Sequence, residues 1–246
     1  EFMKEPSLQV VCARTNIFGN GMQFYNQTLL TNDVIERVIT MNKFEQPATV
    51  FKLSCIQSLG GFDEAYHFIM DREFWVNYLI RHGLEHVRSI PDVIANFRLH
   101  IVSKTVAQKQ MFDRERDELF IGLLKDEDPF LHKQLTVLLE AKERPVTRLV
   151  NRIKENGHID IRTIVSYYLL LRAMEFYETG DKRLARELIA FINTERLQQK
   201  DLKLLRNLNV KIRFMPHFIK KLIQKTGIRT MFIKGKYLLF KLFNTA

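Results

Sequence analysis

The sequence lacks any stretch of about 18 uninterrupted apolar residues, so it predicts no membrane-spanning helix. Cysteine is also scarce, because the 246 residues include only Cys12 and Cys55. These two positions form neither a metal-binding pattern nor a disulfide framework, and we expect both thiols to be reduced in a cytoplasmic protein. The first residues do not have the pattern of a secretory signal, and we interpret Glu1-Phe2 as a cloning remnant.

Acidic residues are absent from positions 202–246, where 11 Lys and Arg residues occur. The whole chain carries 38 basic and 28 acidic residues, so the rest of it has 27 basic and 28 acidic ones and is nearly neutral. We expect basic amphipathic helices over 211–246. The pattern in 215–246 fits an anionic membrane surface about as well as docking on the protein itself. Nucleic acid is an unlikely partner, because no recognition motif accompanies the charge.

Short β-prone runs occupy the first part of the chain and are separated by turn residues. The expected strands are 7–18, 22–30, 48–53, 85–90 and 93–100. Thr31 or Asn32 is expected to cap a short helix through Ile39, and Pro91 is expected to end the fourth strand.

From Ser103 onward, apolar residues recur at the spacing of α-helices. The expected helices are 111–124, 135–139, 146–153, 164–177 and 184–192. Asn156-Gly157 is a helix stop, and Asp181 is a natural N-cap of the last of these helices. The sequence therefore predicts a predominantly α-helical α+β protein.

The stretch 59–75 combines a glycine turn with the start of a helix. Gly60-Gly61 permits backbone angles that a side chain would forbid. Apolar residues recur at helical spacing over 74–79, and Gly83 is a plausible helix stop. Asp71 is therefore expected where a tight loop enters a helix.

Three segments of the chain, in this order, are similar to motifs of one protein family. Family 2 glycosyltransferases with the GT-A fold have a signature that resembles GGFDE at 60–64 followed by MDREFW at 70–75. A second motif of that family resembles ANFRLHIVSKT at 95–105, and the strand before the double glycine resembles EQPATVF at 45–51. The similarity covers about residues 8–106.

The resemblance implies that residues 1–106 form the C-terminal, acceptor-side part of a GT-A α/β domain. We expect a helical accessory domain over 107–210, followed by the basic helices of 211–246. The intact enzyme would transfer a sugar from a nucleotide-sugar donor to a glycan or lipid-linked acceptor in cell-surface polysaccharide biosynthesis. It would be cytoplasmic or bound to the inner face of the membrane. The alternative is a non-catalytic helical interaction or membrane-surface module.

By the same resemblance, Asp71 falls on the position of the catalytic base. A carboxylate in a partly closed loop can accept the proton of an acceptor hydroxyl. The competing interpretation is a helix cap, because Asp is common at helix starts.

The expected substrate-binding residues are Gly61, Asp63, Glu64, Arg98 and His100. Arg98 and His100 lie two residues apart at a strand end, so they would face the same side and could meet the donor diphosphate. His100 could also approach a metal. The competing interpretation is that Arg98 forms a surface ion pair and His100 forms a hydrogen bond to the backbone. Asp63 and Glu64 either line the acceptor side or complete a turn.

GT-A transferases hold the donor diphosphate with a divalent metal, Mg or Mn, at an Asp-x-Asp motif that follows a nucleotide-binding half. No such motif precedes Asp71. We interpret the later run Asp126-Glu127-Asp128 as a solvated acidic turn. We therefore expect this polypeptide to lack the nucleotide-binding half, to bind metal and nucleotide sugar poorly, and to be inactive alone.

Overall fold

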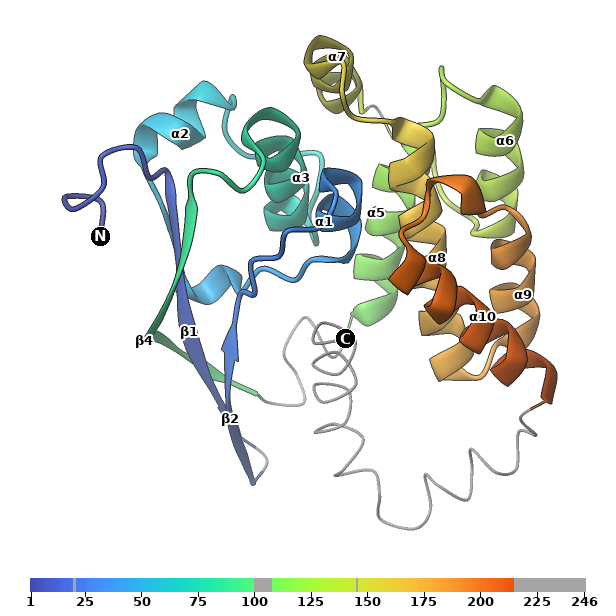
Figure 1. Ribbon diagram of the computed structural model, residues 1–246, viewed down its shortest axis with the longest axis horizontal. Coiled ribbons are helices and arrows are strands. Elements are labelled where there is room, and N and C mark those ends of the chain that lie inside the picture. Colours follow the sequence, from blue (N-terminus) through green and yellow to red (C-terminus); the bar gives the residue numbers. More distant parts are fainter. Residues whose placement is uncertain (20, 100–107, 145, 215–246) are drawn as a thin grey trace. The chain divides into compact units, whose positions relative to one another are not determined.

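The computed structural model describes residues 1–19, 21–99, 108–144 and 146–214 of the chain. The fold is mixed α and β and mostly helical, as the sequence predicts (Figure 1). The chain divides into two compact units, the first made of Glu1–Leu171 with Phe191–Arg196, and the second of Arg172–Ala190 with the chain from Leu197 onward. The described part of the expected helical accessory domain, 107–210, is thus divided between the two units.

A four-stranded sheet in the first unit is built around β1 (Val10–Gly19). β2 (Met22–Gln27) and β3 (Thr49–Phe51) pair antiparallel with β1, whereas β4 (Val87–Arg98) pairs parallel with it (Figure 1). Since β4 follows β1 along most of its length, β2 and β3 share the opposite edge of β1.

Pro91 does not end a strand, so that prediction was wrong. The two segments expected on either side of Pro91 form one continuous strand, β4. Cys12 pairs with Ser89 and Arg14 pairs with Val93, and the register shifts between these two pairs. The ladder is therefore already interrupted where the missing N–H of proline falls, and proline is tolerated at such bulges.

The helices of the first unit follow the predicted order, with bounds that differ by a few residues. They are α1 (Ile35–Met41), α2 (Leu53–Ser58), α3 (Met70–His82), α5 (Lys109–Gly122), α6 (Pro129–Leu138), α7 (Thr147–Asn156) and the first part of α8 (Ile161–Thr179), with short 3-10 turns at Gln46–Ala48 and Thr194–Arg196. The expected cap of α1 by Thr31 or Asn32 was wrong, because Val34 holds the N-cap position without a side-chain bond. Gly157 ends α7 in the left-handed conformation, as expected.

The second unit contains α9 (Lys182–Ala190) and α10 (Gln199–Phe214). Asp181 caps α9, because its Oδ1 accepts the N–H of Leu184 at 2.9 Å. This confirms the predicted cap. The basic helices predicted for 211–246 lie outside the described residues except for 211–214, which end α10.

Aromatic residues of α3 form the centre of the core in the first unit. Trp75 is buried, and its ring stacks on Phe44 with 3.7 Å between ring centroids. Phe51 of β3 lies 5.1 Å from Trp75 by the same measure, so the sheet and α3 share one hydrophobic layer. Cys12 and Cys55 are buried and unbridged.

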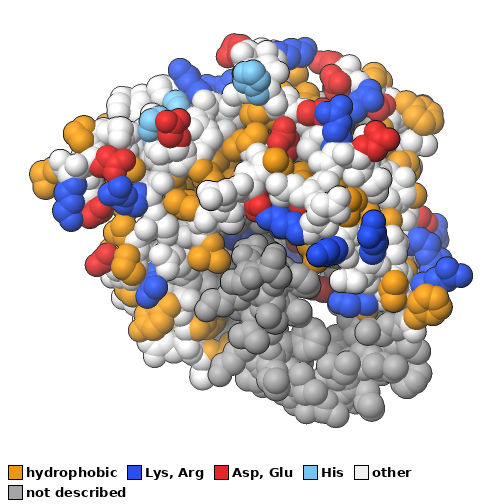
Figure 2. All heavy atoms as spheres, in the orientation of Figure 1, with side chains coloured by type: hydrophobic (Ala, Val, Ile, Leu, Met, Phe, Trp, Pro, Cys, Tyr) orange, Lys and Arg blue, Asp and Glu red, His pale blue; other side chains and the backbone are white. Residues whose placement is uncertain are grey.

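The surface of the described residues is mixed in charge. Figure 2 shows basic and acidic side chains interspersed on the visible face, which agrees with the nearly balanced composition before residue 202. Of the helices in the described ranges, none is both long enough and apolar enough to cross a bilayer.

Candidate functional site

The glycine loop, which we define as residues 59–69, connects α2 to α3 and carries several of the predicted site residues. Gly60 and Gly61 have φ angles of +82° and +74°, in the region that favours glycine. The N–H of Gly61 donates to the carbonyl oxygen of Ile56 at 3.0 Å, and that of Gly60 to Gln57 at 3.0 Å. The double glycine therefore closes the end of α2 and turns the chain toward α3.

Asp71 lies in the first turn of α3 and is half-buried. The N-cap position belongs to Ile69, and no side-chain bond caps the helix from there. Oδ1 of Asp71 accepts the N–H of the next residue, Arg72, at 2.8 Å. Within the described part of the chain, Oδ2 has no hydrogen-bond partner, and the adjacent Met70 is 49% exposed. Asp71 is therefore not the N-cap residue of α3, although its Oδ1 satisfies one open N–H of the first turn.

Glu115 of α5 binds the backbone of the last three residues before α3. The two carboxylate oxygens of Glu115 accept the backbone N–H groups of His67, Phe68 and Ile69 at 3.0, 2.8 and 3.1 Å. Glu115 is only 4% exposed. This carboxylate satisfies the N–H groups of two loop residues and of the N-cap residue, Ile69, and lies near the positive end of the helix dipole.

Sequence reasoning missed Glu115, although a signal was present. The residue lies four positions after Met111 and four before Leu119, on the apolar face of the predicted helix. A carboxylate on a face that packs inward requires a buried partner. The sequence did not show which backbone groups supply it.

Arg72 fixes α3 against α1. Its guanidinium donates to the carbonyl oxygens of Ile39, Thr40 and Asn42, at 2.6, 2.6 and 2.7 Å, where α1 ends. A cation at this position stabilises the negative end of the helix dipole. Burial lowers the pKa of Arg72 to about 10, with a smaller contribution from the charge of Arg116, so the group stays protonated at neutral pH.

α7 holds both the glycine loop and α3. Nη2 of Arg148 lies 2.5 Å from Oε2 of Glu73, and Nη1 donates to the carbonyl oxygen of Gly61 at 3.3 Å. One turn further along α7, Arg152 donates to the carbonyl oxygen of Leu59 at 3.0 Å. Glu73 is 1% exposed, and its burial raises the pKa of its carboxyl group even though Arg148 opposes that shift. The geometry of the loop therefore depends on helices that follow it by many residues.

The two acidic residues predicted within the loop differ in their surroundings. Asp63 is half-buried, and its Oδ1 accepts the N–H of Ala65 at 2.9 Å, which completes a turn. Glu64 is exposed, and across the described ranges it makes no hydrogen bond or ion pair. Gly61 shapes the loop through its backbone and contacts Arg148 through its carbonyl.

Arg98 lies at the end of β4 and is exposed. Among the residues with described positions, no hydrogen bond or ion pair links it to Asp63, Glu64 or Asp71. His100 lies outside the described residues. The structure thus brings the predicted acidic residues onto one loop and helix start, while the pairing of Arg98 with His100 stays a prediction.

The acidic run 126–128 has a structural role. Asp128 caps α6 by accepting the N–H of Leu131 at 3.1 Å, and Glu127 lies 3.8 Å from Arg162. Over the described parts of the chain, no three His, Cys, Asp or Glu side chains cluster in a way that could hold a metal ion. The described residues therefore do not form a site for a resident Mg or Mn.

No protein-family model matches this chain, and no curated protein or solved structure is significantly similar to it. The glycine loop and the motifs around it are therefore the features that bear on function. Asp63 and Asp71 are both half-buried, and each has one carboxylate oxygen that accepts a backbone N–H and one without a hydrogen-bond partner in the described chain. Asp71 is the one of the two that lies at the start of α3.

Proposed function

We propose that residues 8–106 provide the acceptor side of a family 2 glycosyltransferase with the GT-A fold, and that Asp71 is its general base. The observation that carries this proposal is the Oδ2 atom of Asp71, which has no hydrogen-bond partner among the described residues. Asp71 follows the N-cap residue of α3, and its Oδ1 accepts only the N–H of the adjacent Arg72. The motifs around Asp71 then favour catalysis over a purely structural role.

In the proposed reaction, the oxygen of an acceptor hydroxyl attacks the anomeric carbon of a nucleotide sugar. Its proton passes to Asp71, and the bond between that carbon and the diphosphate oxygen breaks, so that the nucleoside diphosphate leaves with the electron pair. Attack opposite the leaving group inverts the anomeric configuration. The glycine loop holds Asp71 in place because α5 and α7 fix both of its ends.

The developing charge on the diphosphate needs cations. Arg98 and His100 are the candidates in this chain, and a nucleotide-binding half would contribute the Asp-x-Asp motif and the Mg or Mn that it holds. The described residues of this chain do not themselves offer a group of ligands for that metal. The proposed acceptor is a glycan or lipid-linked glycan of the cell surface.

Asp71→Asn in the natural full-length protein is expected to lower the transfer rate by about a hundredfold, because an amide cannot accept the acceptor proton. The measurement is sugar transfer from a panel of nucleotide sugars to glycan and lipid-linked acceptors. Asp126→Asn is the matched control, since this exposed aspartate makes no hydrogen bond or ion pair in the described chain. Equal rates for both variants would remove Asp71 from the mechanism.

The uneven charge of the chain favours a membrane surface as a second candidate partner. Residues 202–246 carry 11 basic and no acidic residues, and a lipid-linked acceptor would be reached most readily from the inner face of the membrane. We expect the full chain to float with vesicles that contain anionic phospholipid, and a chain ending at Phe214 to lose most of this binding. Vesicles of neutral phospholipid are the control. Undiminished flotation of the shortened chain would contradict the assignment to 215–246.

A further inference from the structure

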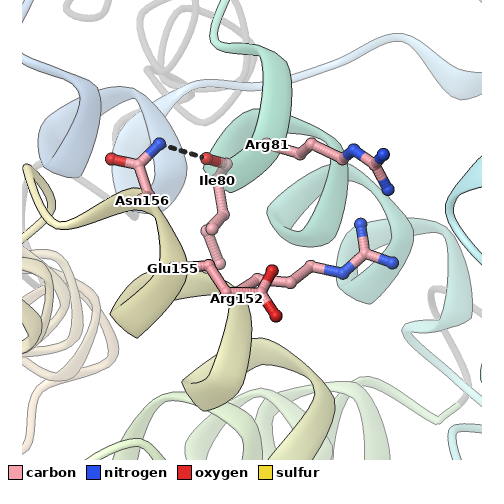
Figure 3. Close-up of a pocket in the computed structure, with 5 residues that line it drawn as sticks. All are labelled: Ile80, Arg81, Arg152, Glu155 and Asn156. Carbon is pink, nitrogen blue, oxygen red and sulfur yellow. Dashed lines mark hydrogen bonds between the residues drawn. The ribbon is translucent and has the colours of Figure 1, made fainter.

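A pocket of about 280 Å³ lies between α3 and α7, apart from the proposed catalytic residue (Figure 3). Its lining residues are Ile80, Arg81, Arg152, Glu155 and Asn156. Nδ2 of Asn156 donates to the carbonyl oxygen of Ile80 at 3.0 Å and joins the two helices at one side of the pocket. Arg81 follows Asp71 by ten residues of helix, which corresponds to about 15 Å along the axis of α3.

The guanidinium groups of Arg81 and Arg152 project toward the same side of the pocket (Figure 3). Nη1 of Arg81 donates to the carbonyl oxygen of Ser58 at 3.0 Å, and Nη2 of Arg152 donates to that of Leu59 at 3.0 Å. These bonds hold both groups beside the same turn and leave most of their N–H donors for another partner.

The charges of the two arginines are not matched by carboxylates. Neither forms an ion pair with any residue that the structure describes, and Nη1 of Arg152 is buried without a hydrogen-bond partner there. Burial lowers the pKa of Arg152, and the charges of Arg81 and Arg148 lower it further. The charges of Glu155, which also lines the pocket, and of Glu73 oppose this shift only in part. A bound anion would relieve the repulsion between the arginines.

We propose that this pocket binds a phosphate group through Arg81 and Arg152. Two guanidinium groups side by side offer planar, paired donors that match the oxygens of phosphate, and their two positive charges match a dianion better than a single carboxylate. The volume exceeds that of one phosphate, so the pocket also admits a pyrophosphate or the first atoms of a phosphate ester. The ligand is therefore a soluble phosphate compound or the headgroup of a phospholipid.

The test titrates the full chain with inorganic pyrophosphate and, separately, with a short-chain phosphatidate below its micelle concentration, using calorimetry. We expect the wild type to bind, and Arg81→Gln to weaken the Kd by at least about tenfold, since it removes a charged, paired donor. Arg81→Lys keeps the charge and should lose less. Arg81 is exposed, so these changes leave the core intact.

Lys154→Gln removes one positive charge from an exposed position of the same helix and is the matched control. We expect its Kd to stay within about twofold of the wild-type value, because a long-range charge effect is screened by salt. Tighter binding of phosphatidate than of pyrophosphate would identify a lipid headgroup, and the reverse a soluble ligand. Failure of both ligands to bind, or equal weakening by Arg81→Gln and Lys154→Gln, would overturn the proposal. Neither result depends on whether Asp71 is catalytic.

Discussion

Glu115→Ala is expected to lower the free energy of unfolding by about 4 kcal/mol. The change leaves three backbone N–H groups at the start of α3 without their acceptor, and hydrogen bonds to a charged group contribute about 1.5 kcal/mol each. Arg144, which lies 3.6 Å from Glu115, also loses an opposite charge. Urea denaturation, followed by circular dichroism at neutral pH, measures the effect.

Two further variants separate the loss of these three hydrogen bonds from the general effects of losing a glutamate. Glu115→Gln keeps the shape and one acceptor oxygen, so we expect it to recover about half of the loss. Glu64→Ala, in the exposed part of the same loop, should change the free energy of unfolding by less than about 0.5 kcal/mol. If Glu115→Ala changed the free energy of unfolding as little as Glu64→Ala, the hydrogen bonds of Glu115 to the backbone would contribute little to stability.

Local sequence signals predicted most of the individual elements correctly. The hairpin of β1 and β2, the helix that begins near Asp71 and the cap by Asp181 all follow from turn residues and apolar spacing. Pro91 shows where such signals fail. Whether a proline ends a strand depends on whether the neighbouring strand needs a hydrogen bond from that position. This is a property of the sheet and not of the local sequence.

The contacts that position the candidate site could not be predicted, because they join residues far apart in the chain. Glu115 binds backbone N–H groups that lie 46 to 48 residues earlier, and Arg148 reaches Glu73 across 75 residues. Both contacts involve a charged group in the protein interior. Composition and spacing mark such a charge as unusual but do not identify its partner. The same contacts join the glycine loop and the start of α3 to α5 and α7, which lie in the same compact unit.

The predicted acidic residues Asp63 and Asp71 also differ in how far the local sequence explains their roles. Asp63 makes the turn that its position after a double glycine allows, and this needs only local information. Asp71 could be a cap or a base from its sequence position alone. The structure places it in the first turn, after the N-cap residue, with one carboxylate oxygen bound to the N–H of Arg72. Its role in proton transfer stays a prediction.

Arg148→Met is expected to destabilise the protein by about 3–4 kcal/mol at pH 8, because it leaves the buried carboxylate of Glu73 without its partner. Burial already raises the pKa of Glu73, and removal of Arg148 takes away the main opposing influence, so the pKa rises further. A folded-state pKa above the unfolded value means that the folded protein takes up a proton more readily. The destabilisation is therefore expected to shrink as the pH falls from 8 to 5.

Urea denaturation of the variant and the wild type at both pH values measures this dependence. Glu73→Gln in the Arg148→Met background removes the unpaired charge, so the double variant should be more stable at pH 8 than Arg148→Met alone. Lys154→Met on the exposed side of α7 is the control for loss of a cation and should show neither effect. A destabilisation by Arg148→Met that does not vary with pH, and that Glu73→Gln does not relieve, would show that Arg148 acts through its contact with Gly61 and through packing. In that case the ion pair would not be what fixes α7 to α3, and the glycine loop would depend on hydrogen bonds to its carbonyl groups alone.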